Sequence, residues 1–291
     1  MGKPAYLVTG GSGQVGAAVA RVAALRGIEV YAPPRSVLDL NQGQSIRDAI
    51  RSRQWAAVIN CGAYTGVDKA ESEVAIAQAV NALAPAIIAQ ETARVRIPII
   101  QVSTDYVFDG AKPEPYDEAD KVCPIGVYGS TKEAGETAVR NNNPHHAIIR
   151  TAWVVSAGGA NFINTMLRLG LERSVIKVVQ DQVGCPSSAN DIANALLTVA
   201  QDLDGRGDTW HFVNDGNASW YDLAAHIFAE TARRDLPTPT LMPITSEEYP
   251  TPAKRPANSR LSTKKIEADF AIVPRPWQTA VDEILIERLN R

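Results

Sequence analysis

Short apolar runs alternate with segments of helical periodicity through the first 180 residues of the chain. The runs contain few polar residues, as is typical of strands that are covered on both faces. This alternation predicts an α/β fold built on a doubly wound parallel sheet with helices on both faces. The expected strands are Ala5–Thr9, Ile28–Ala32, Ala57–Cys61, Ile97–Ser103, Ala147–Arg150 and Val175–Val179, and the expected helices lie near residues 14–26, 42–53, 71–93 and 128–141.

The regular alternation of apolar runs and helical segments ends after about residue 180. Asp191 to Ala200 is expected to form one more helix of the sheet domain, and loops such as Asp202–Asp208 follow it. Eight of the 18 prolines fall within residues 237–276, so this region cannot be helical throughout. We expect a smaller, loop-rich C-terminal substrate domain that interleaves with the dinucleotide-binding domain. The latter would take residues 1–150 and about 174–203, and the substrate domain would take about 151–173 and 204–291.

The composition of the chain argues against a nucleic-acid partner, a membrane span and a metal site. The formal net charge is −3 and no basic stripe is present, which argues against a nucleic-acid partner. No apolar run reaches the roughly 18 to 20 residues of a membrane helix, and the first strand leads directly into a glycine loop, so we expect neither a membrane span nor a signal peptide. We expect a cytoplasmic protein with reduced thiols and no metal site, because the cysteines and histidines lack metal-ligand spacing; they are Cys61, Cys123, Cys185, His145, His146, His211 and His226.

A glycine-rich segment follows the first strand and opens the first helix. Residues 9–16 read TGGSGQVG and contain the spacing G-x-G-x-x-G. Glycines at this spacing allow a tight turn and a close approach to a pyrophosphate, which the helix N-terminus also attracts. The sequence therefore predicts a Rossmann-type dinucleotide site, in which the cofactor-binding residues are Gly10, Gly13, Gln14, Val15 and Gly16.

The end of the second strand bears on the choice of cofactor. An acidic residue about 20 positions after the glycine loop would bind the ribose 2′-hydroxyl and favour NAD. The segment Tyr31–Arg35 has no acid, and Arg35 offers a guanidinium to a 2′-phosphate. We therefore expect NADPH, with NADH as the alternative, and we expect Asp39 and Leu40 to lie beside the adenine.

Tyr128 and Lys132 stand four residues apart in a predicted helix and would share one face. A phenol with its ordinary pKa of about 10 is a poor acid at neutral pH, and a nearby cation lowers that pKa. We expect Lys132 to do this while it binds a ribose hydroxyl, and Tyr128 to protonate the oxygen that hydride transfer creates. Thr104 follows the fourth strand, where open α/β sheets place ligands, and can donate to a substrate carbonyl. These three residues form the predicted catalytic set.

Six segments, together with the glycine loop, resemble one enzyme family. They span nearly the whole chain and are Tyr64–Glu71, Ser103–Phe108, Tyr128–Lys132, Arg150–Val154, Asp181–Pro186 and Arg255–Leu261. This set resembles the extended short-chain dehydrogenases, and among them the dTDP-4-dehydrorhamnose reductases. The resemblance implies an NAD(P)H-dependent oxidoreductase that reduces the C4 ketone of dTDP-4-dehydro-L-rhamnose to dTDP-L-rhamnose, for cell-surface polysaccharide synthesis.

The resemblance also assigns roles by motif. Thr104 and Tyr128 would hold the C4 oxygen, Tyr128 would supply the proton, and Lys132 would bind the nicotinamide ribose. Arg260 would meet the diphosphate as a bidentate donor. Further substrate residues would be Val67, Asp105, Tyr106 and Trp153, further cofactor residues Ala63 and Tyr64, and weaker candidates for the nucleotide side Asn161, Gln182 and Asn258.

Other functions stay open from the residues alone. A sugar-nucleotide 4-epimerase or 4,6-dehydratase would share the fold, although a dehydratase needs a glutamate where this chain has Tyr106. A non-catalytic regulatory subunit, resembling that of methionine adenosyltransferase, would share it too. Some relatives are described as magnesium-linked dimers, but Ala17 and Ala18 stand where an acid would be needed. We therefore expect no metal, a dTDP-sugar as partner, no membrane partner, and a monomer or homodimer.

Overall fold

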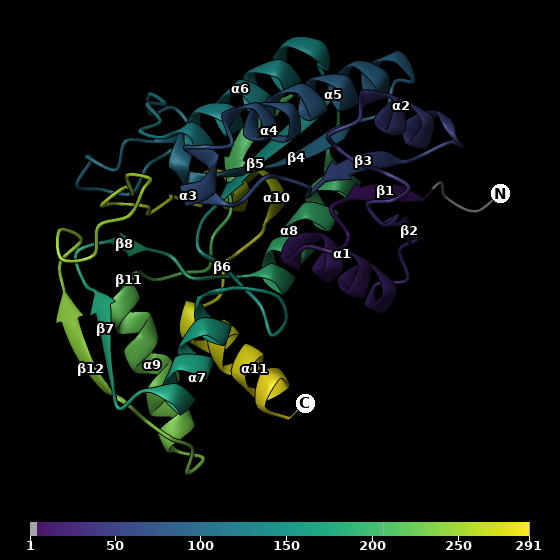
Figure 1. Cartoon of the computed structure of the whole chain (residues 1–291). Helices are drawn as coiled ribbons and strands as arrows, with labels where there is room; N and C mark the ends of the chain where they lie inside the picture. The colour runs from purple at the N-terminus through teal and green to yellow at the C-terminus, as the bar shows by residue number, and fades with distance from the viewer. Residues whose placement is uncertain (1–4, 206, 291) are drawn as a thin grey trace.

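The computed structural model describes residues 5–205 and 207–290, and its largest element is a six-stranded parallel sheet (Figure 1). The strands lie in the order β10-β5-β4-β3-β1-β2. The chain leaves β1 towards β2 on one side and returns to β3 on the other, so the switch point of the sheet lies between β1 and β3, where such sheets bind ligands. The strands are β1 (Tyr6–Thr9), β2 (Val30–Tyr31), β3 (Ala57–Asn60), β4 (Ile99–Thr104), β5 (His146–Thr151) and β10 (Asp208–His211).

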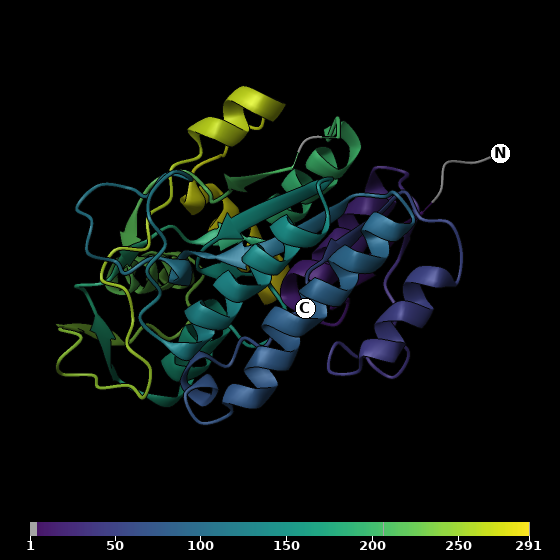
Figure 2. The ribbon, with the colours of Figure 1, turned by 90° about the horizontal axis from the view of Figure 1, so that it is seen from above.

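Helices cover both faces of this sheet (Figures 1 and 2). On one face lie α2 (Gly43–Arg51), α5 (Ala84–Arg94) and α6 (Val127–Asn142), and on the other α1 (Gln14–Leu25) and α8 (Ala189–Asp202). Neighbouring strand residues serve opposite faces: Val58 joins the apolar cluster under α2 and α5, and Ile59 joins the one under α1 and α8. The predicted doubly wound α/β fold is thus confirmed.

The helix expected near residues 71–93 has several parts. A short helix, α3 (Val67–Ala70), comes first, and α4 (Val74–Gln78) then runs through a π-helical turn, η1 (Ala79–Leu83), into α5. Pro85 stands at the start of α5 and has no N–H to offer the carbonyl of Asn81. A change of hydrogen-bond spacing at this point follows from that missing donor.

One helix bears on the expectation of no membrane span. The continuous helix Val74–Arg94 has 21 residues and is long and apolar enough, by length and composition, to cross a membrane. Half of its apolar window is buried inside the molecule, where α5 packs against α6 and α2. Packing in the helical layer therefore accounts for its apolar composition.

The strand pairing corrects two expectations. Val175–Val179 is a strand, β7, but it pairs with β12 (Thr240–Ile244) in a separate two-stranded sheet. Its exposed and buried residues alternate, which does not suit a sheet covered on both faces. The sixth strand of the main sheet is instead β10, whose last three residues are buried beside β5. The expected division of the chain gave β7 to the dinucleotide part and β10 to the substrate part, and the pairing reverses both.

A smaller lobe lies beside the carboxyl ends of the main strands (Figure 1). It contains β7, β12, α7 (Phe162–Glu172), α9 (Trp220–Ala232) and α11 (Trp277–Leu289), which enclose their own apolar cluster. Two short strand pairs lie between the lobe and the sheet: β6 (Val154–Val155) with β9 (Ser187–Ser188), and β8 (Val183–Gly184) with β11 (Ala218–Ser219). The last helix of the sheet part, α10 (Lys264–Phe270), contacts β10 and α8.

Candidate active site

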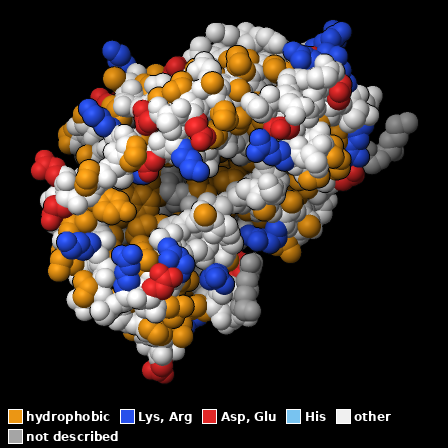
Figure 3. Space-filling model, in the orientation of Figure 1, with side chains coloured by type: hydrophobic (Ala, Val, Ile, Leu, Met, Phe, Trp, Pro, Cys, Tyr) orange, Lys and Arg blue, Asp and Glu red, His pale blue; other side chains and the backbone are white. Residues whose placement is uncertain are grey.

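The molecular surface is hollowed between the sheet and the smaller lobe (Figure 3). Hydrophobic side chains line one side of this hollow, and Lys and Arg side chains lie around its rim. The carboxyl ends of the main strands face this region (Figure 1). Most residues with predicted chemistry come from these strand ends and from the loops that follow them.

The glycine loop lies between the carboxyl end of β1 and the start of α1. Gly10 has φ of +66°, and a Cβ there would lie 2.6 Å from Gly62 Cα, so this position requires glycine. A Cβ on Gly16 would lie 2.2 Å from the carbonyl oxygen of Gly10. Among the described residues no side chain caps α1 at Gly13, so its first N–H groups are open to an anion. The loop fits the pyrophosphate of a dinucleotide.

Gln14, the first residue of α1, joins the glycine loop to the smaller lobe. Its Oε1 accepts hydrogen bonds from Ser156 Oγ at 2.6 Å and from Asn161 Nδ2 at 2.9 Å. Asn161 is also the N-cap of α7, where its side chain accepts the N–H of Asn164 at 3.1 Å. The side chain of Asn161 is thus engaged within the chain. Val15 packs against the apolar cluster under α1.

Arg35 follows β2 and extends into solvent. Its side chain is 75% exposed, and its Nε lies 3.4 Å from Asp39 Oδ1. These two residues, with Ser45 and others, line an open hollow of about 400 Å³. Leu40 lies further in, where its Cδ1 would be 2.4 Å from a Cβ on Gly62. The guanidinium is therefore free to turn towards a ligand, held only by an exposed ion pair.

Asn81 is a buried residue that sequence reasoning missed. It lies in η1, and its Oδ1 accepts the N–H of Tyr64 at 2.8 Å. Its Nδ2 donates to the Tyr64 carbonyl at 3.1 Å and to Thr131 Oγ1 at 3.2 Å. Asn81 thereby ties the segment of Ala63 and Tyr64, which follows β3, to the helix α6. The Tyr64 phenol itself bonds to Glu73 near the surface.

The end of β4 brings Thr104, Asp105 and Tyr106 to the carboxyl edge of the sheet. Thr104 Oγ1 donates to Asp105 Oδ1 at 2.9 Å and accepts the Tyr106 N–H at 3.2 Å, so it caps the 3-10 turn η2 (Asp105–Val107). Burial raises the pKa of Asp105 to about 6, against the opposing effect of the Ser259 and Thr104 hydroxyls. These three predicted substrate residues do lie together.

Tyr128 lies in the first turn of α6 and faces the same group. The Thr104 hydroxyl lowers the pKa of its phenol, and the ring of Tyr106 meets it edge-on, with 5.4 Å between centroids. Burial raises the pKa of Tyr128 well above its usual value, and the charge of Asp105 raises it further. Tyr128 therefore carries its proton at neutral pH, as a proton donor must, although the raised pKa makes it a weaker acid than an ordinary tyrosine.

Lys132 lies one turn further along α6, and its ammonium donates to the carbonyl of Val102 at 2.7 Å. Burial lowers the pKa of Lys132 to about 8, although the Glu136 carboxylate raises it. The expectation that Lys132 lowers the pKa of Tyr128 is wrong for this structure. Burial and Asp105 determine the pKa of the phenol, and the ammonium is bound to the backbone of β4.

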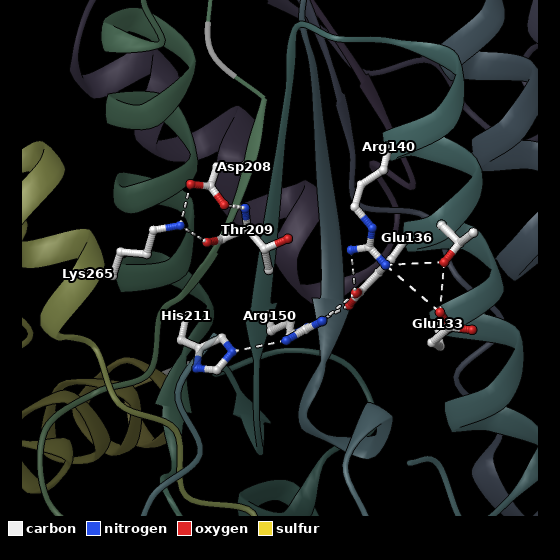
Figure 4. Close-up of polar contacts among 9 residues, drawn as sticks. Glu133, Glu136, Arg140, Arg150, Asp208, Thr209, His211 and Lys265 are labelled. Atoms are coloured by element: carbon white, nitrogen blue, oxygen red, sulfur yellow. Dashed lines mark hydrogen bonds and ion pairs between the residues drawn. The ribbon is translucent and has the colours of Figure 1, made fainter. Parts of the chain in front are cut away.

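A buried ion pair joins α6 to β5 (Figure 4). Glu136, one turn further along α6, accepts Arg150 Nε at 2.9 Å and Arg150 Nη2 at 2.7 Å. Arg150 Nη1 lies 3.5 Å from Nε2 of His211 on β10, and burial lowers the pKa of His211 to about 3, so this imidazole is neutral. Sequence reasoning missed the pair. An arginine within the apolar strand 146–151 was the available signal.

The segment after residue 250 contacts the site through Arg255. Arg255 donates to Asp68 Oδ2 at 2.9 Å and to the Tyr106 hydroxyl at 3.2 Å. Val67 precedes Asp68 at the start of α3 and is half-buried. Arg255 therefore connects α3, which carries Val67, to the group around Thr104.

Trp153 belongs to an aromatic stack rather than to the Thr104 group. It has φ of +47°, and its ring lies 3.5 Å from that of Trp220 with 5° between the planes. A Cβ on Gly184 would lie 2.4 Å from the Trp153 indole, so glycine makes room for it. Gln182 accepts the Trp220 indole N–H at 3.1 Å. Gln182 thus orients the stack, and the half-buried Trp153 is left partly open.

Arg260 and Asn258 bind acceptors of their own chain. Arg260 Nε donates to Asn258 Oδ1 at 2.8 Å, and its Nη2 donates to the Pro113 carbonyl. Asn258 Nδ2 donates to the carbonyls of Lys112 at 2.6 Å and Glu114 at 2.8 Å. Both residues fasten the segment 112–114 to the C-terminal segment, and the nucleotide contacts expected of them stay predictions.

One group of potential metal ligands lies away from this site. His226, Glu230 and Asp282 place their ligand atoms within 4.8 Å of one another. His226 Nε2 already lies 2.7 Å from Asp282 Oδ1, and Glu230 is paired with Arg233. We assign no metal to these residues because each has a protein partner, and the expected absence of a metal site stays a prediction.

Comparison with known sequences gives a consistent result. The family model of the RmlD substrate binding domain matches residues 5–290. A dTDP-4-dehydrorhamnose reductase of Sinorhizobium fredii is 41% identical over 287 residues, which cover 96% of this chain and 95% of that protein. The reductase of the same name from Escherichia coli is 39% identical over 254 residues, which cover 86% and 85%.

Solved structures agree with these relatives. A dTDP-4-dehydrorhamnose reductase from Clostridium acetobutylicum has a TM-score of 0.92 at 37% identity and covers 98% of this chain and 99% of its own. A reductase of this name from Bacillus anthracis, in complex with NADP, has a TM-score of 0.92 at 30% identity, covering 98% and 100%. A dTDP-glucose 4,6-dehydratase and a UDP-glucose 4-epimerase score 0.82 and 0.81 at 14% and 18% identity, which shows the fold alone.

Proposed function

The chain belongs to the dTDP-4-dehydrorhamnose reductase family, and from this premise we propose how its site works. It is an NADPH-dependent oxidoreductase that reduces the C4 ketone of dTDP-4-dehydro-L-rhamnose to dTDP-L-rhamnose, for cell-surface polysaccharide synthesis. The observation that carries the residue assignment is the half-buried, protonated phenol of Tyr128. It lies beside Thr104 at the carboxyl edge of the sheet, the edge at which the glycine loop follows β1.

The residues of the chain have separate roles in cofactor binding, substrate binding and proton transfer. When bound, the nicotinamide cofactor supplies the hydride that reduces the ketone carbon. Gly10 and Gly16 leave the space a Cβ would fill, and the open N–H groups of α1 receive the pyrophosphate. Tyr128 gives its proton to the C4 oxygen, which Thr104 also holds. Lys132 binds the nicotinamide ribose through its ammonium, which is present below a pH of about 8.

The other functions considered from the sequence fit less well. A 4,6-dehydratase would need a glutamate at the position of Tyr106, and a tyrosine cannot supply the carboxylate that this reaction uses. A regulatory subunit would have no need of the Thr104, Tyr128 and Lys132 arrangement. No observation favours the 4-epimerase.

The direct test mixes the purified protein with NADPH and dTDP-4-dehydrorhamnose, follows the loss of NADPH absorbance, and identifies the product by NMR. The expected product is dTDP-L-rhamnose, formed in equal amount to the NADPH consumed. A product with the other configuration at C4, or a folded protein that consumes no NADPH, would reject the assignment.

Arg35→Ala is expected to weaken NADPH binding about tenfold while leaving NADH binding nearly unchanged. A charge-assisted hydrogen bond to the 2′-phosphate contributes about 1.5 to 3 kcal/mol, and the 75% exposure of this side chain favours the lower end. Fluorescence titration with each cofactor measures the two dissociation constants. Arg47→Ala, which removes a guanidinium from α2, is the matched control. Equal weakening of both cofactors would show that Arg35 does not meet the 2′-phosphate.

Lys132→Met should weaken NADPH binding about 10- to 100-fold at neutral pH, because an ammonium that donates to the ribose is lost. The pKa of Lys132 is lowered to about 8, so the ammonium is present below that pH and is lost as the pH rises through it. The wild-type dissociation constant should therefore increase through this range, and that of Lys132→Met should stay level. Titrations at several pH values check this, and a parallel rise in both proteins would remove Lys132 from cofactor binding.

The remaining assignments concern the partners, the cellular location, the oligomeric state and the substrate domain. We propose a dTDP-sugar as the only substrate class, no nucleic-acid or membrane partner, and a cytoplasmic enzyme that is a monomer or homodimer. The net charge of −3 argues against a nucleic-acid partner, and among the described residues the long apolar helix Val74–Arg94 has half of its window buried inside the molecule. We also propose that the smaller lobe, with β7 and without β10, forms the substrate domain.

A further inference from the structure

Thr104 has one hydroxyl proton, and in this structure that proton is directed at Asp105. An ionised carboxylate can only accept hydrogen bonds, and Asp105 Oδ1 lies 2.9 Å from Thr104 Oγ1. The Thr104 oxygen accepts the N–H of Tyr106 at 3.2 Å and also meets the phenol of Tyr128. In this arrangement Thr104 has no proton left for the carbonyl of a substrate.

Few groups around Asp105 stabilise the ionised form of its carboxyl. The residue is 4% exposed, its Oδ2 has no hydrogen-bond partner among the described residues, and none of their Lys or Arg side chains forms an ion pair with it. The groups that face it from each packed element are the hydroxyl of Thr104 on β4, Tyr106 in η2, Tyr128 on α6, Ser259 in the C-terminal segment and the thiol of Cys185 before β9. All of these are neutral at pH 7.

The charge of Asp105 also opposes the reaction. It raises the pKa of Tyr128 and of Tyr106, so an ionised Asp105 disfavours the phenolate that proton transfer from Tyr128 must leave. Protonation of Asp105 removes this charge. It also turns the side chain from an acceptor into a donor towards Thr104 Oγ1, which frees the hydroxyl proton of Thr104. Thr104 and Tyr128 can then both point their protons at one ketone oxygen.

We propose that Asp105 is a positioning residue that acts through Thr104: its protonated side chain turns the Thr104 hydroxyl towards the C4 oxygen of the substrate, and its ionised side chain turns that hydroxyl away. This inference rests on the proposed function. Asp105 keeps its own proton throughout. The hydride goes to C4, and the proton that completes the alcohol comes from Tyr128.

The test is the pH profile of kcat at saturating NADPH and dTDP-4-dehydrorhamnose, over roughly pH 5 to 9. Wild-type kcat should fall about tenfold per pH unit as the pH rises above the pKa of Asp105. That pKa is about 6 in the structure, where burial already raises it. Asp105→Asn stays neutral and should lose this limb of the profile. Ser259→Ala should move the midpoint of the limb to higher pH, because the Ser259 hydroxyl lowers the pKa of Asp105.

Asp109→Asn is the matched control, since it makes the same change four residues along at an exposed position. It should keep the wild-type profile. The inference is overturned if wild-type kcat is level across the range, if the limb persists in Asp105→Asn, or if Ser259→Ala leaves the midpoint in place. Should Asp105→Asn fail to fold by circular dichroism, the Ser259→Ala shift decides alone. A folded wild-type protein that oxidises no NADPH at any pH rejects the proposed function instead.

Discussion

Tyr128→Phe should lower turnover by on the order of 10²-fold or more while NADPH binding and stability change little. The phenol is the only proton donor of the described residues that we place on the C4 oxygen besides Thr104, and loss of a general acid usually has this effect. Burial and Asp105 raise the pKa of this phenol, so it is protonated at neutral pH. The Tyr128→Phe variant therefore lacks a proton donor. Steady-state rates of NADPH oxidation measure the loss.

Tyr116→Phe is the control for this variant, because it removes a phenol oxygen from another buried tyrosine, stacked on Phe108 away from Tyr128. Its turnover should stay within a few-fold of the wild type. If Tyr128→Phe turned over as fast as Tyr116→Phe, Tyr128 would have no part in the proton transfer.

Arg150→Met is expected to cost about 3 to 5 kcal/mol in the free energy of unfolding, the effect of breaking a buried ion pair. Glu136 is 0% exposed, and among the described residues it would keep one ion-pair partner, Arg140 at 3.2 Å. Burial raises the pKa of Glu136, but Arg150, Ser103 and Arg140 together lower it below its usual value, so the carboxylate is charged at neutral pH. Urea unfolding at neutral pH measures the change.

Two further variants make this prediction specific. Glu136→Gln combined with Arg150→Met should recover most of the lost stability, because no unpaired charge stays buried. Arg168→Met breaks an exposed pair with Glu172 on α7 and should cost at most about 1 kcal/mol. A loss in Arg150→Met no larger than that of Arg168→Met would contradict a structural role for the buried pair.

Short-range patterns in the sequence were enough to predict the framework of the site. The apolar runs and helical periods predicted the doubly wound sheet, and the glycine spacing predicted the loop in which Gly10 and Gly16 leave no room for a Cβ. The spacing of Tyr128 and Lys132 predicted their common helix, α6. These features follow from backbone geometry and local periodicity, which act between residues close in the chain.

Strand partners could not be predicted in the same way. The segments 175–179 and 208–211 are both short and could each pair with any free edge. Their places were decided by β12 and β5, which lie 61 or more positions away in sequence. Pairing of this kind depends on which edges the whole fold leaves open.

What the sequence determined by itself is the alternation of strands and helices through the first five strands of the main sheet, the glycine loop, and the identity of the residues that can donate, accept or carry charge. The tertiary structure decided how those residues behave: Lys132 bonds to Val102, Asp105 competes for the proton of Thr104, and burial raises the pKa of Tyr128 where a nearby lysine had been expected to lower it. The physical reason is that desolvation and electrostatic fields at one atom depend on every segment packed around it, whatever its distance along the chain.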